Sequence, residues 1–363
     1  MRHLLIILCV LTTFPTTLQA EIRLPKIFAD HMVLQRDQKV AIWGWAEAGE
    51  TITLKTPHET QTLKAGEDGK WMTRLKPMQA GGPIEISLRG SNEIVLKDIL
   101  IGDVWLCSGQ SNMEWSVAAS INPQEEIANA KWPNLRLFDV KKVPQIDPTD
   151  DVQLDAPWLP CSPDSIPRFS AVAYFFGRKL HQELEIPIGL ISTNWGGTRI
   201  EPWTPPEGFA TVEAVKDIPN SINREKYNQG TPTTLYNGMV HGLVPFGVKG
   251  AIWYQGESNR HDGMLYHEKM KALIAGWRNV FHQPDLPFYF VQLAPFIYKN
   301  DAPDVLPKLW ESQLATLSVP QTGMAVTTDI SNLNDIHPKN KQDVGLRLAL
   351  WALAKDYSKD VVY

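Results

Sequence analysis

From residue 99 onward, apolar runs of strand length alternate with longer amphipathic runs, and this alternation restricts the fold of the 363-residue chain more than any other feature. Repeated strand, helix, strand units produce a mostly parallel sheet with helices on both faces. We therefore predict an α/β domain over residues 99–363. Its expected strands are residues 103–107, 188–193, 248–253, 288–293 and 324–328, and its expected helices are residues 169–184, 233–243, 265–281, 308–317 and 341–357.

Two segments fall outside the alternation. Residues 117–165 are rich in Pro and Asp, which predicts an insertion with little regular structure that forms a rim or lid. Residues 21–98 hold short alternating runs between turn-forming sequences, which predicts a small β-sandwich. Such a domain either binds sugar or supports the larger domain. We favour support, because its Trp residues are no more than strand aromatics.

The first 20 residues have the pattern of a secretory signal peptide. Arg2 precedes an apolar run over residues 4–11, and the segment ends at Ala20. That run is too short to span a bilayer, and no later run of about 18 apolar residues occurs. We expect an exported protein, periplasmic or secreted, without a membrane anchor. Outside the leader, Cys107 and Cys161 either form a disulfide or remain two buried thiols.

Charge and motif content exclude several classes of function. The net charge of −5 comes with no basic stripe of the kind that neutralises phosphates, so nucleic acid is not an expected partner. HExxH and CxxC motifs are missing, and His261 and His267 would point to nearly opposite sides of a helix. A Gly-rich nucleotide loop is missing too. We expect neither a metal nor a cofactor.

Residues 103–116 carry the first candidate for chemistry. The apolar run that ends at Cys107 is followed by the turn-forming sequence Ser-Gly-Gln-Ser-Asn, with Ser111 in its centre. Ligands of open α/β sheets bind outside the carboxyl ends of the strands, which is where this hydroxyl would lie. On its own, a serine in a turn is more often only a turn residue.

Two further stretches strengthen the case for Ser111. Residues 253–259, Trp-Tyr-Gln-Gly-Glu-Ser-Asn, again end an apolar segment with polar groups, and His337 lies beside Asp335 just before an amphipathic segment. A serine nucleophile needs a base, a group that orients the base, and donors directed at the oxyanion. These stretches supply all three, with His337 as the general base.

In this order, the strings GQSNM (109–113), NWGGT (194–198), WYQGESN (253–259) and DIHPKNK (335–341) resemble the sialate O-acetylesterase branch of the SGNH hydrolase superfamily. The resemblance runs from about residue 24 to residue 357. It implies a three-layer SGNH-hydrolase-like sandwich and a serine esterase that acts through an acyl-enzyme on O-acetylated sialic acid.

The resemblance also implies site residues. The superfamily usually places an Asp three residues before the His, but that position is Asn334 here, so we assign the orienting role to Asp335. Side chains two apart in an extended segment point to the same side, which lets Asp335 reach the imidazole. The alternatives are Glu257 and a backbone carbonyl.

The expected oxyanion donors are the backbone N–H groups of Ser111 and Gly197 and the side-chain amide of Gln255. Gln110 and Asn112 flank the serine as candidate support or substrate contacts, with Glu257 in the same role. Arg199 is a candidate partner for a substrate carboxylate, because a guanidinium matches that shape.

Two other functions remain open from the sequence. The first is an esterase for acetylated xylan or other plant glycans, which would share the chemistry and differ in the pocket. The second is a catalytically inactive carbohydrate-binding protein that uses some of the 13 Trp residues. Members of the resembled family usually continue beyond the helix after the His motif, whereas this chain stops at Tyr363. We therefore expect either a truncated gene model that lacks a β-rich segment or a protein less stable than its relatives.

Overall fold

A parallel sheet forms the centre of the computed structural model, which describes residues 21–363. Strand order is β13-β12-β11-β7-β10-β8-β9, and every neighbouring pair is parallel except the antiparallel edge pair β8 and β9. The expected leader, residues 1–20, lies outside the described residues. The strands are β7 (Glu93–Gly109), β8 (Trp132–Val140), β9 (Leu154–Cys161), β10 (Ile188–Asn194), β11 (Gly250–Tyr254), β12 (Phe288–Val291) and β13 (Thr322–Ala325).

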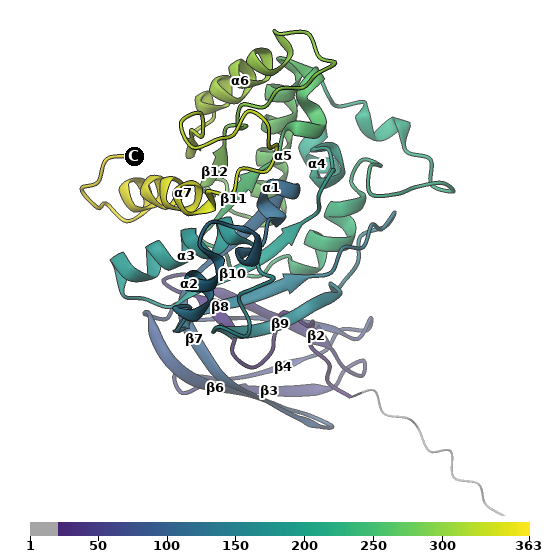
Figure 1. Ribbon diagram of the computed structural model, residues 1–363. Helices are drawn as coiled ribbons and strands as arrows, with labels where there is room; N and C mark the ends of the chain where they lie inside the picture. Colours follow the sequence, from purple (N-terminus) through teal and green to yellow (C-terminus); the bar gives the residue numbers. More distant parts are fainter. Residues whose placement is uncertain (1–20) are drawn as a thin grey trace, which may run out of the picture.

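Helices cover both faces of this sheet (Figure 1). Trp105 of β7 contacts Phe176 of α3 at 4.9 Å between ring centroids, whereas Trp253 of β11 contacts Trp277 of α5 at 6.0 Å. Trp253 pairs in register with Ser108, so it points to the opposite face from Trp105. Every residue of β10 and β11 is buried, as strands covered on both faces require. The expected mixed α/β architecture is confirmed.

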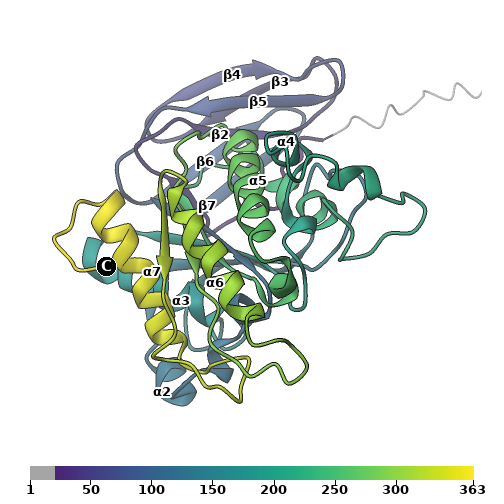
Figure 2. The ribbon, with the colours of Figure 1, turned by 90° about the horizontal axis from the view of Figure 1, so that it is seen from above.

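The described helices match most of the predicted ones. Helices α3 and α7 pack against each other on one face, and α4 packs against α5 on the other (Figure 2). None of the described helices is long and apolar enough to cross a membrane. The α-helices are α1 (Ser111–Glu114), α2 (Pro123–Ala128), α3 (Ala171–Leu184), α4 (Pro206–Ala210), α5 (Leu265–Val280), α6 (Val305–Ala315) and α7 (Lys341–Asp356).

One prediction about regular structure is wrong. Residues 117–165 do not form an irregular insertion, because they contain strands β8 and β9 of the central sheet. Pro is tolerated in β9 because that strand lies at the edge, where a missing N–H removes no ladder hydrogen bond. The helix expected over 233–243 is present, as a π-helix, η4 (Tyr236–Val240), followed by a 3₁₀ turn, η5 (His241–Leu243). The other short 3₁₀ turns are η1 (Val117–Ala119), η2 (Glu201–Trp203), η3 (Ile218–Ser221), η6 (Glu257–Asp262) and η7 (Thr316–Ser318).

The N-terminal strands form an antiparallel part that is joined to the central sheet through β7 (Figure 1). Strand β7 has 17 residues; its first half pairs with β6 and its second half lies between β10 and β11. Strands β2 and β5 form a separate two-stranded sheet. The boundary predicted at residues 98 and 99 falls inside β7, and a separate β-sandwich domain stays a prediction. The strands are β1 (Val33–Gln35), β2 (Val40–Trp45), β3 (Thr51–Lys55), β4 (Thr60–Lys64), β5 (Lys70–Leu75) and β6 (Gly81–Arg89).

The two cysteines within residues 21–363 are free thiols. Cys107 lies on β7 and Cys161 at the end of β9, and both are buried. Burial raises the pKa of Cys107, and burial likewise raises the pKa of Cys161 to about 12. Of the two alternatives that the sequence left open, the structure has the buried thiols.

Candidate active site

Three strands of the central sheet end at the same level. Gly109, the last residue of β7, is in register with Asn194 at the end of β10 and with Tyr254 at the end of β11. The polar sequence that follows each strand therefore lies at one edge of the sheet, where α/β proteins bind their ligands. Parallel pairing thus brings together three of the motifs that the sequence singled out.

Ser111 and His337 meet at this edge. Ser111 is the first residue of α1, and its Oγ lies 2.9 Å from Nε2 of His337, which belongs to the loop between β13 and α7. The imidazole stacks on Trp115 with ring centroids 4.7 Å apart and planes 14° from parallel. This contact fixes the ring plane and leaves Nε2 directed at the hydroxyl.

The surroundings of His337 favour the neutral imidazole that a general base requires. Burial and then the nearby Lys341 charge lower the pKa of His337, whereas the Asp335 and Glu114 charges act to raise it. A lowered pKa keeps the imidazole neutral at neutral pH, and only a neutral imidazole can accept a proton from Ser111.

Asp335 contacts the His337 backbone. One carboxylate oxygen accepts a hydrogen bond from the His337 N–H at 2.9 Å. Within residues 21–363, no hydrogen bond joins this carboxylate to the His337 ring. Its negative charge still acts to raise the pKa of the imidazole. The orienting role of Asp335 therefore stays a prediction, with loop geometry as the contribution that the contacts support.

Asn112 and Glu257 are buried behind the serine. Asn112 Nδ2 donates to Glu257 Oε1 at 2.5 Å and to the Ile336 carbonyl at 3.0 Å, and its Oδ1 accepts from Lys341 Nζ at 2.5 Å. Burial raises the pKa of Glu257, while Asn112 and the Lys341 charge oppose that rise. None of these contacts reaches the His337 ring.

Gln110 and Gln255 link the loops that follow the three strands. Gln255 Nε2 donates to Gln110 Oε1 at 3.0 Å, to the Thr198 carbonyl at 3.2 Å and to Asn259 Oδ1 at 2.7 Å. Its Oε1 accepts from the Tyr266 hydroxyl at 2.8 Å. Both the nitrogen and the oxygen of the Gln255 amide therefore have hydrogen-bond partners. Gln255 is buried and is not among the residues that line the cavity described below.

The two glycines after β10 differ in their surroundings. Gly196 is so close to Ser111 that an added Cβ would lie 3.3 Å from the Ser111 Cβ. Its N–H donates to Glu114 Oε2 at 2.6 Å. Gly197 has φ +74°, a conformation that favours glycine, and no atom lies within 4 Å of an added Cβ. This loop therefore approaches the serine with an open backbone beside it.

Arg199 does not face the site. Its guanidinium donates to Glu201, to Asp262 and to the carbonyl of Ser258, at 2.9 to 3.3 Å. Lys269 donates to the same two carboxylates. The role of substrate-carboxylate partner expected for Arg199 does not fit, because the neighbouring acids already occupy its donors.

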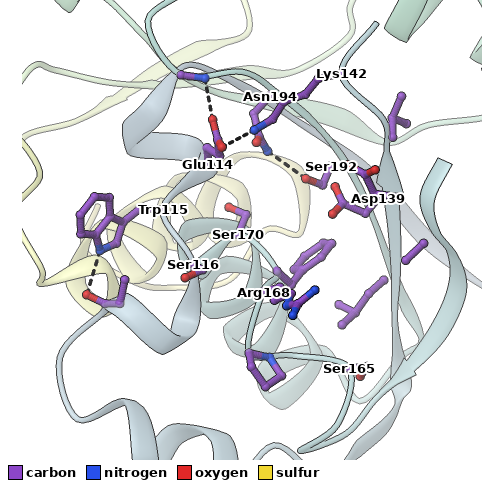
Figure 3. A pocket seen from close by; sticks show the side chains of 18 of the residues that line it. Glu114, Trp115, Ser116, Asp139, Lys142, Ser165, Arg168, Ser170, Ser192 and Asn194 are labelled. Atoms are coloured by element: carbon purple, nitrogen blue, oxygen red, sulfur yellow. Dashed lines mark hydrogen bonds and ion pairs between the residues drawn. The ribbon is translucent and has the colours of Figure 1, made fainter. Parts of the chain in front are cut away.

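A cavity of about 1190 Å³ has Ser111 and His337 in its lining. Figure 3 shows it from close by, with Glu114, Trp115 and Asn194 among the labelled lining residues. Its walls come from α1, from the loop after β10, and from β8, β9 and the segment that follows β9. Polar residues are spread along it, and five of them lie within residues 117–165, which the sequence predicts to be irregular. The polar lining residues are Glu114, Ser116, Asp139, Lys142, Asp155, Asp164, Ser165, Arg168, Ser170, Ser192 and Asn194.

The charges on the cavity wall are partly compensated. Lys142 pairs with Glu114, whereas Arg168 has no acidic partner among residues 21–363 (Figure 3). Burial raises the pKa of Asp139 to about 6, with the Asp155 charge acting in the same direction. The cavity thus offers one unpaired guanidinium and several hydrogen-bonding oxygens, a combination that suits a polar, ring-shaped ligand.

Comparison with known proteins points to esterases. Residues 101–354 match the family model described as carbohydrate esterase, sialic acid-specific acetylesterase. Sialate O-acetylesterase of Homo sapiens is 34% identical, over 90% of this chain and 70% of that protein, and the enzyme of Rattus norvegicus is 32% identical over 91% and 72%. A carbohydrate acetylesterase from Xanthomonas citri has a similar structure, with a TM-score of 0.86, 39% identity, and coverage of 94% of this chain and 77% of that one.

Proposed function

The chain belongs to the sialic acid-specific acetylesterase family of carbohydrate esterases, and we propose that it removes O-acetyl groups, of the 9-O-acetyl type, from sialic acid on glycans. It is a carboxylic ester hydrolase. The observation that carries the proposal is the 2.9 Å contact between Ser111 Oγ and His337 Nε2 at the wall of a cavity large enough for a sugar.

The proposed reaction has two steps. His337 Nε2 takes the Ser111 proton as Oγ attacks the acetyl carbonyl, and the tetrahedral intermediate collapses when the sugar oxygen leaves with that proton. Water then attacks acetyl-Ser111 with His337 again as base, which releases acetate and restores the hydroxyl. No cofactor takes part, and every proton that moves passes through the imidazole.

For the oxyanion we propose the N–H groups of Ser111 and Gly197 as two donors. The expected third donor, Gln255, already donates to three acceptors. Asn194 is better placed because it lines the cavity, and its Nδ2 donates only to Ser192 Oγ among the described residues, at 2.8 Å. We propose Asn194 in place of Gln255.

Arg168 is the proposed partner of the sialic acid carboxylate. It lines the same cavity as Ser111 and, unlike Lys142 and Arg199, has no carboxylate partner in the described chain. A guanidinium binds a carboxylate through two parallel hydrogen bonds, which would set the orientation of the acetylated side of the sugar toward Ser111.

The test is acetate release from 9-O-acetylated sialic acid and from acetylated xylo-oligosaccharide by wild type, Ser111→Ala, Arg168→Gln and Arg224→Gln. Arg224 is a matched surface control that pairs with Asp147. We expect Ser111→Ala to lose release from both substrates. Arg168→Gln should lose about 10-fold or more in kcat/KM on the sialic acid alone, as removal of a charged hydrogen bond predicts. Equal effects of Arg168→Gln and Arg224→Gln would contradict the substrate assignment.

A second candidate substrate is a neutral acetylated glycan. Four acids line the cavity against two permanent cations, Lys142 and Arg168, and excess carboxylate favours sugar hydroxyls over an anionic sugar. The structural relative from Xanthomonas citri is described as a carbohydrate acetylesterase without a named sugar. Faster release from the xylo-oligosaccharide would establish this alternative and leave the mechanism unchanged.

We also propose that residues 1–20 direct export and are then removed. The support is their sequence pattern: a basic start, a short apolar run and the small residue Ala20. N-terminal sequencing of the protein purified from the periplasm or medium should begin at Glu21. An intact Met1 in the cytoplasmic fraction would contradict it.

A further inference from the structure

The side chain of Asn112 joins three distant parts of the chain next to the nucleophile. Its Oδ1 accepts from Lys341 Nζ at 2.5 Å, and its Nδ2 donates to Glu257 Oε1 at 2.5 Å and to the Ile336 carbonyl at 3.0 Å. An ammonium group can only donate, and a carbonyl can only accept. These partners therefore allow one orientation of the amide, with its oxygen toward Lys341.

The bond to Ile336 reaches the segment that carries the base. Ile336 immediately precedes His337, and the segment from residue 326 to residue 340 contains none of the helices or strands of the fold. Ser111 and His337 are 226 positions apart in the sequence, yet their side chains meet at 2.9 Å. The Asn112–Ile336 bond ties this irregular segment directly to the helix that begins at Ser111.

Lys341 is an unusual residue for its position. It is the first residue of α7 and is 0% exposed, and its Nζ has no carboxylate within ion-pair distance in the described chain. A cation at the N-terminus of a helix meets the positive end of the helix dipole. Burial of a charge without an ion pair is also costly. A methionine would fill this place without those costs, so packing alone does not account for the lysine.

Glu257, on the other side of Asn112, is also a buried ionisable residue without an ion pair in the described chain. It is 7% exposed, and its Oε2 has no hydrogen-bond partner within residues 21–363. Two buried ionisable side chains, one from α7 and one from the segment after β11, thus hold one neutral amide between them. Neither contacts the cavity in which the substrate is proposed to bind.

We propose that Lys341 and Glu257 are positioning residues: they fix the Asn112 amide so that it holds the His337 segment at Ser111. This inference rests on the proposed roles of Ser111 and His337. It assigns to the buried pair a function in catalysis that does not involve contact with substrate.

A change in the pH profile follows from the same arrangement. The charged groups around the imidazole are Lys341 from α7, Asp335 from the same segment and Glu114 from α1, with Glu257 beyond Asn112. Burial and Lys341 lower the pKa of His337, and the two acids oppose them. Loss of the Lys341 cation therefore raises the pKa of His337. Because the neutral imidazole is the active form, the acid limb of the pH–rate profile then moves to higher pH.

The experiment uses p-nitrophenyl acetate, a small ester that needs little of the sugar cavity. Wild type, Lys341→Met, Lys341→Gln and Lys269→Met are compared by kcat, KM, pH–rate profile and thermal melt. Lys269 is the matched control, a second buried lysine that lies outside the cavity. We expect Lys341→Met to lower kcat about 10- to 100-fold, part of the 10² to 10⁴ that a positioned base contributes, with KM changed about twofold at most.

The glutamine variant separates the two effects of the lysine. Lys341→Gln keeps a donor for Asn112 Oδ1 but has no charge, so it should regain kcat while its acid limb stays at the higher pH of Lys341→Met. Lys269→Met should melt at a lower temperature and keep the wild-type acid limb. A Lys341→Met protein with the kcat and acid limb of wild type would overturn the inference.

Asn112→Asp keeps the test decisive if Lys341→Met does not fold. The new carboxylate would pair with Lys341 but would also face the Glu257 carboxylate, so Glu257→Gln is combined with it to supply a donor there. The Asp side chain still has no N–H to donate to the Ile336 carbonyl. We expect a folded protein with kcat lowered about 10-fold or more, in line with loss of base positioning. Wild-type kcat in this variant would overturn the inference. The proposed function would fail by a different result, namely wild-type activity that is absent or that persists in Ser111→Ala. That result can be told apart from the one that overturns the positioning role.

Discussion

Lys269 and Lys341 are both buried, but their surroundings are opposite. Lys269 Nζ lies 2.7 Å from Glu201 and 2.6 Å from Asp262, and Arg199 contacts the same two acids. Lys341 donates to the neutral amide of Asn112 instead, and burial lowers the pKa of Lys341 to about 7. One lysine completes a compensated charge cluster, whereas the other remains poorly compensated.

The position of each lysine explains the difference. The compensated cluster joins the loop after β10 to α5 and lies away from the cavity, so its groups can keep fixed charges. The Lys341 region lies directly behind Ser111 and His337, where shifted pKa values are typical of functional sites. We infer that charge pairing stabilises the fold around Lys269. Around Lys341, the unpaired buried charge lowers stability but helps to position His337 as the base.

The largest expected effect separates chemistry from structure. Ser111→Ala and His337→Ala should each lower turnover about 10⁴- to 10⁶-fold, because acyl transfer loses its nucleophile or base. Steady-state acetate release measures the loss, and thermal melts should stay close to wild type. If folded Arg199→Gln lost as much turnover as Ser111→Ala, the compensated cluster would take part in the chemistry. That result would contradict the purely stabilising role assigned to the cluster.

The next largest effect concerns stability. Lys269→Met leaves the Glu201 and Asp262 carboxylates buried without their lysine, which should lower the free energy of unfolding by about 3 to 5 kcal/mol. Lys341→Met removes an unpaired buried charge and should cost far less or stabilise the fold. Urea unfolding of both variants measures the difference. A larger loss for Lys341→Met would reverse the assignment of the two regions.

The two candidate side-chain oxyanion donors, Asn194 and Gln255, should differ in what their loss affects. Asn194→Ala should lower kcat about 10²- to 10³-fold with little change in the melt, since it removes one cavity donor. Gln255→Ala should act chiefly on stability, because its amide bonds to the loops after β7 and β10 and to Asn259. If the two variants exchange these effects, Gln255 is the donor, as the sequence suggested.

The smallest effect is the dependence of stability on pH. Burial acts to raise the pKa of Glu201, but Arg199 and Lys269 outweigh it and lower the pKa to about 2, from an ordinary value of 4.5. A depressed folded-state pKa contributes stability that is complete above pH 4.5 and is lost as the pH falls toward 2. Urea unfolding from pH 6 to pH 3 should show a smaller decline in Glu201→Gln than in wild type. An equal decline would contradict the assignment.

Strong periodicity predicted the regular part of the fold well. The starts of strand β12 and helix α5 occur where the apolar and amphipathic runs place them, because burial on one or two faces determines those runs. Strands β8 and β9 were missed because Pro133, Pro157 and Pro160 break the pattern expected of a strand. That error hid the part of the cavity wall that carries Asp139 and Asp155.

The motifs located the Ser111 and His337 pair but not its supporting contacts. The sequence places Arg199 beside the NWGGT string, and only the fold shows that Glu201 and Asp262 already occupy it. Asn112 and Lys341 are 229 positions apart, and no periodicity links two single polar residues over such a distance. Specific side-chain pairs across loops depend on tertiary packing, which local sequence patterns do not encode.

The most direct test of the account is covalent labelling of the nucleophile. Wild type, Ser111→Ala and His337→Ala are treated with a fluorophosphonate, and the labelled peptide is mapped by mass spectrometry over time. The account predicts label on Ser111 alone, none in Ser111→Ala, and much slower labelling in His337→Ala because the base is missing. Active wild-type enzyme that labels at another residue, or labelling at an unchanged rate without His337, would contradict it.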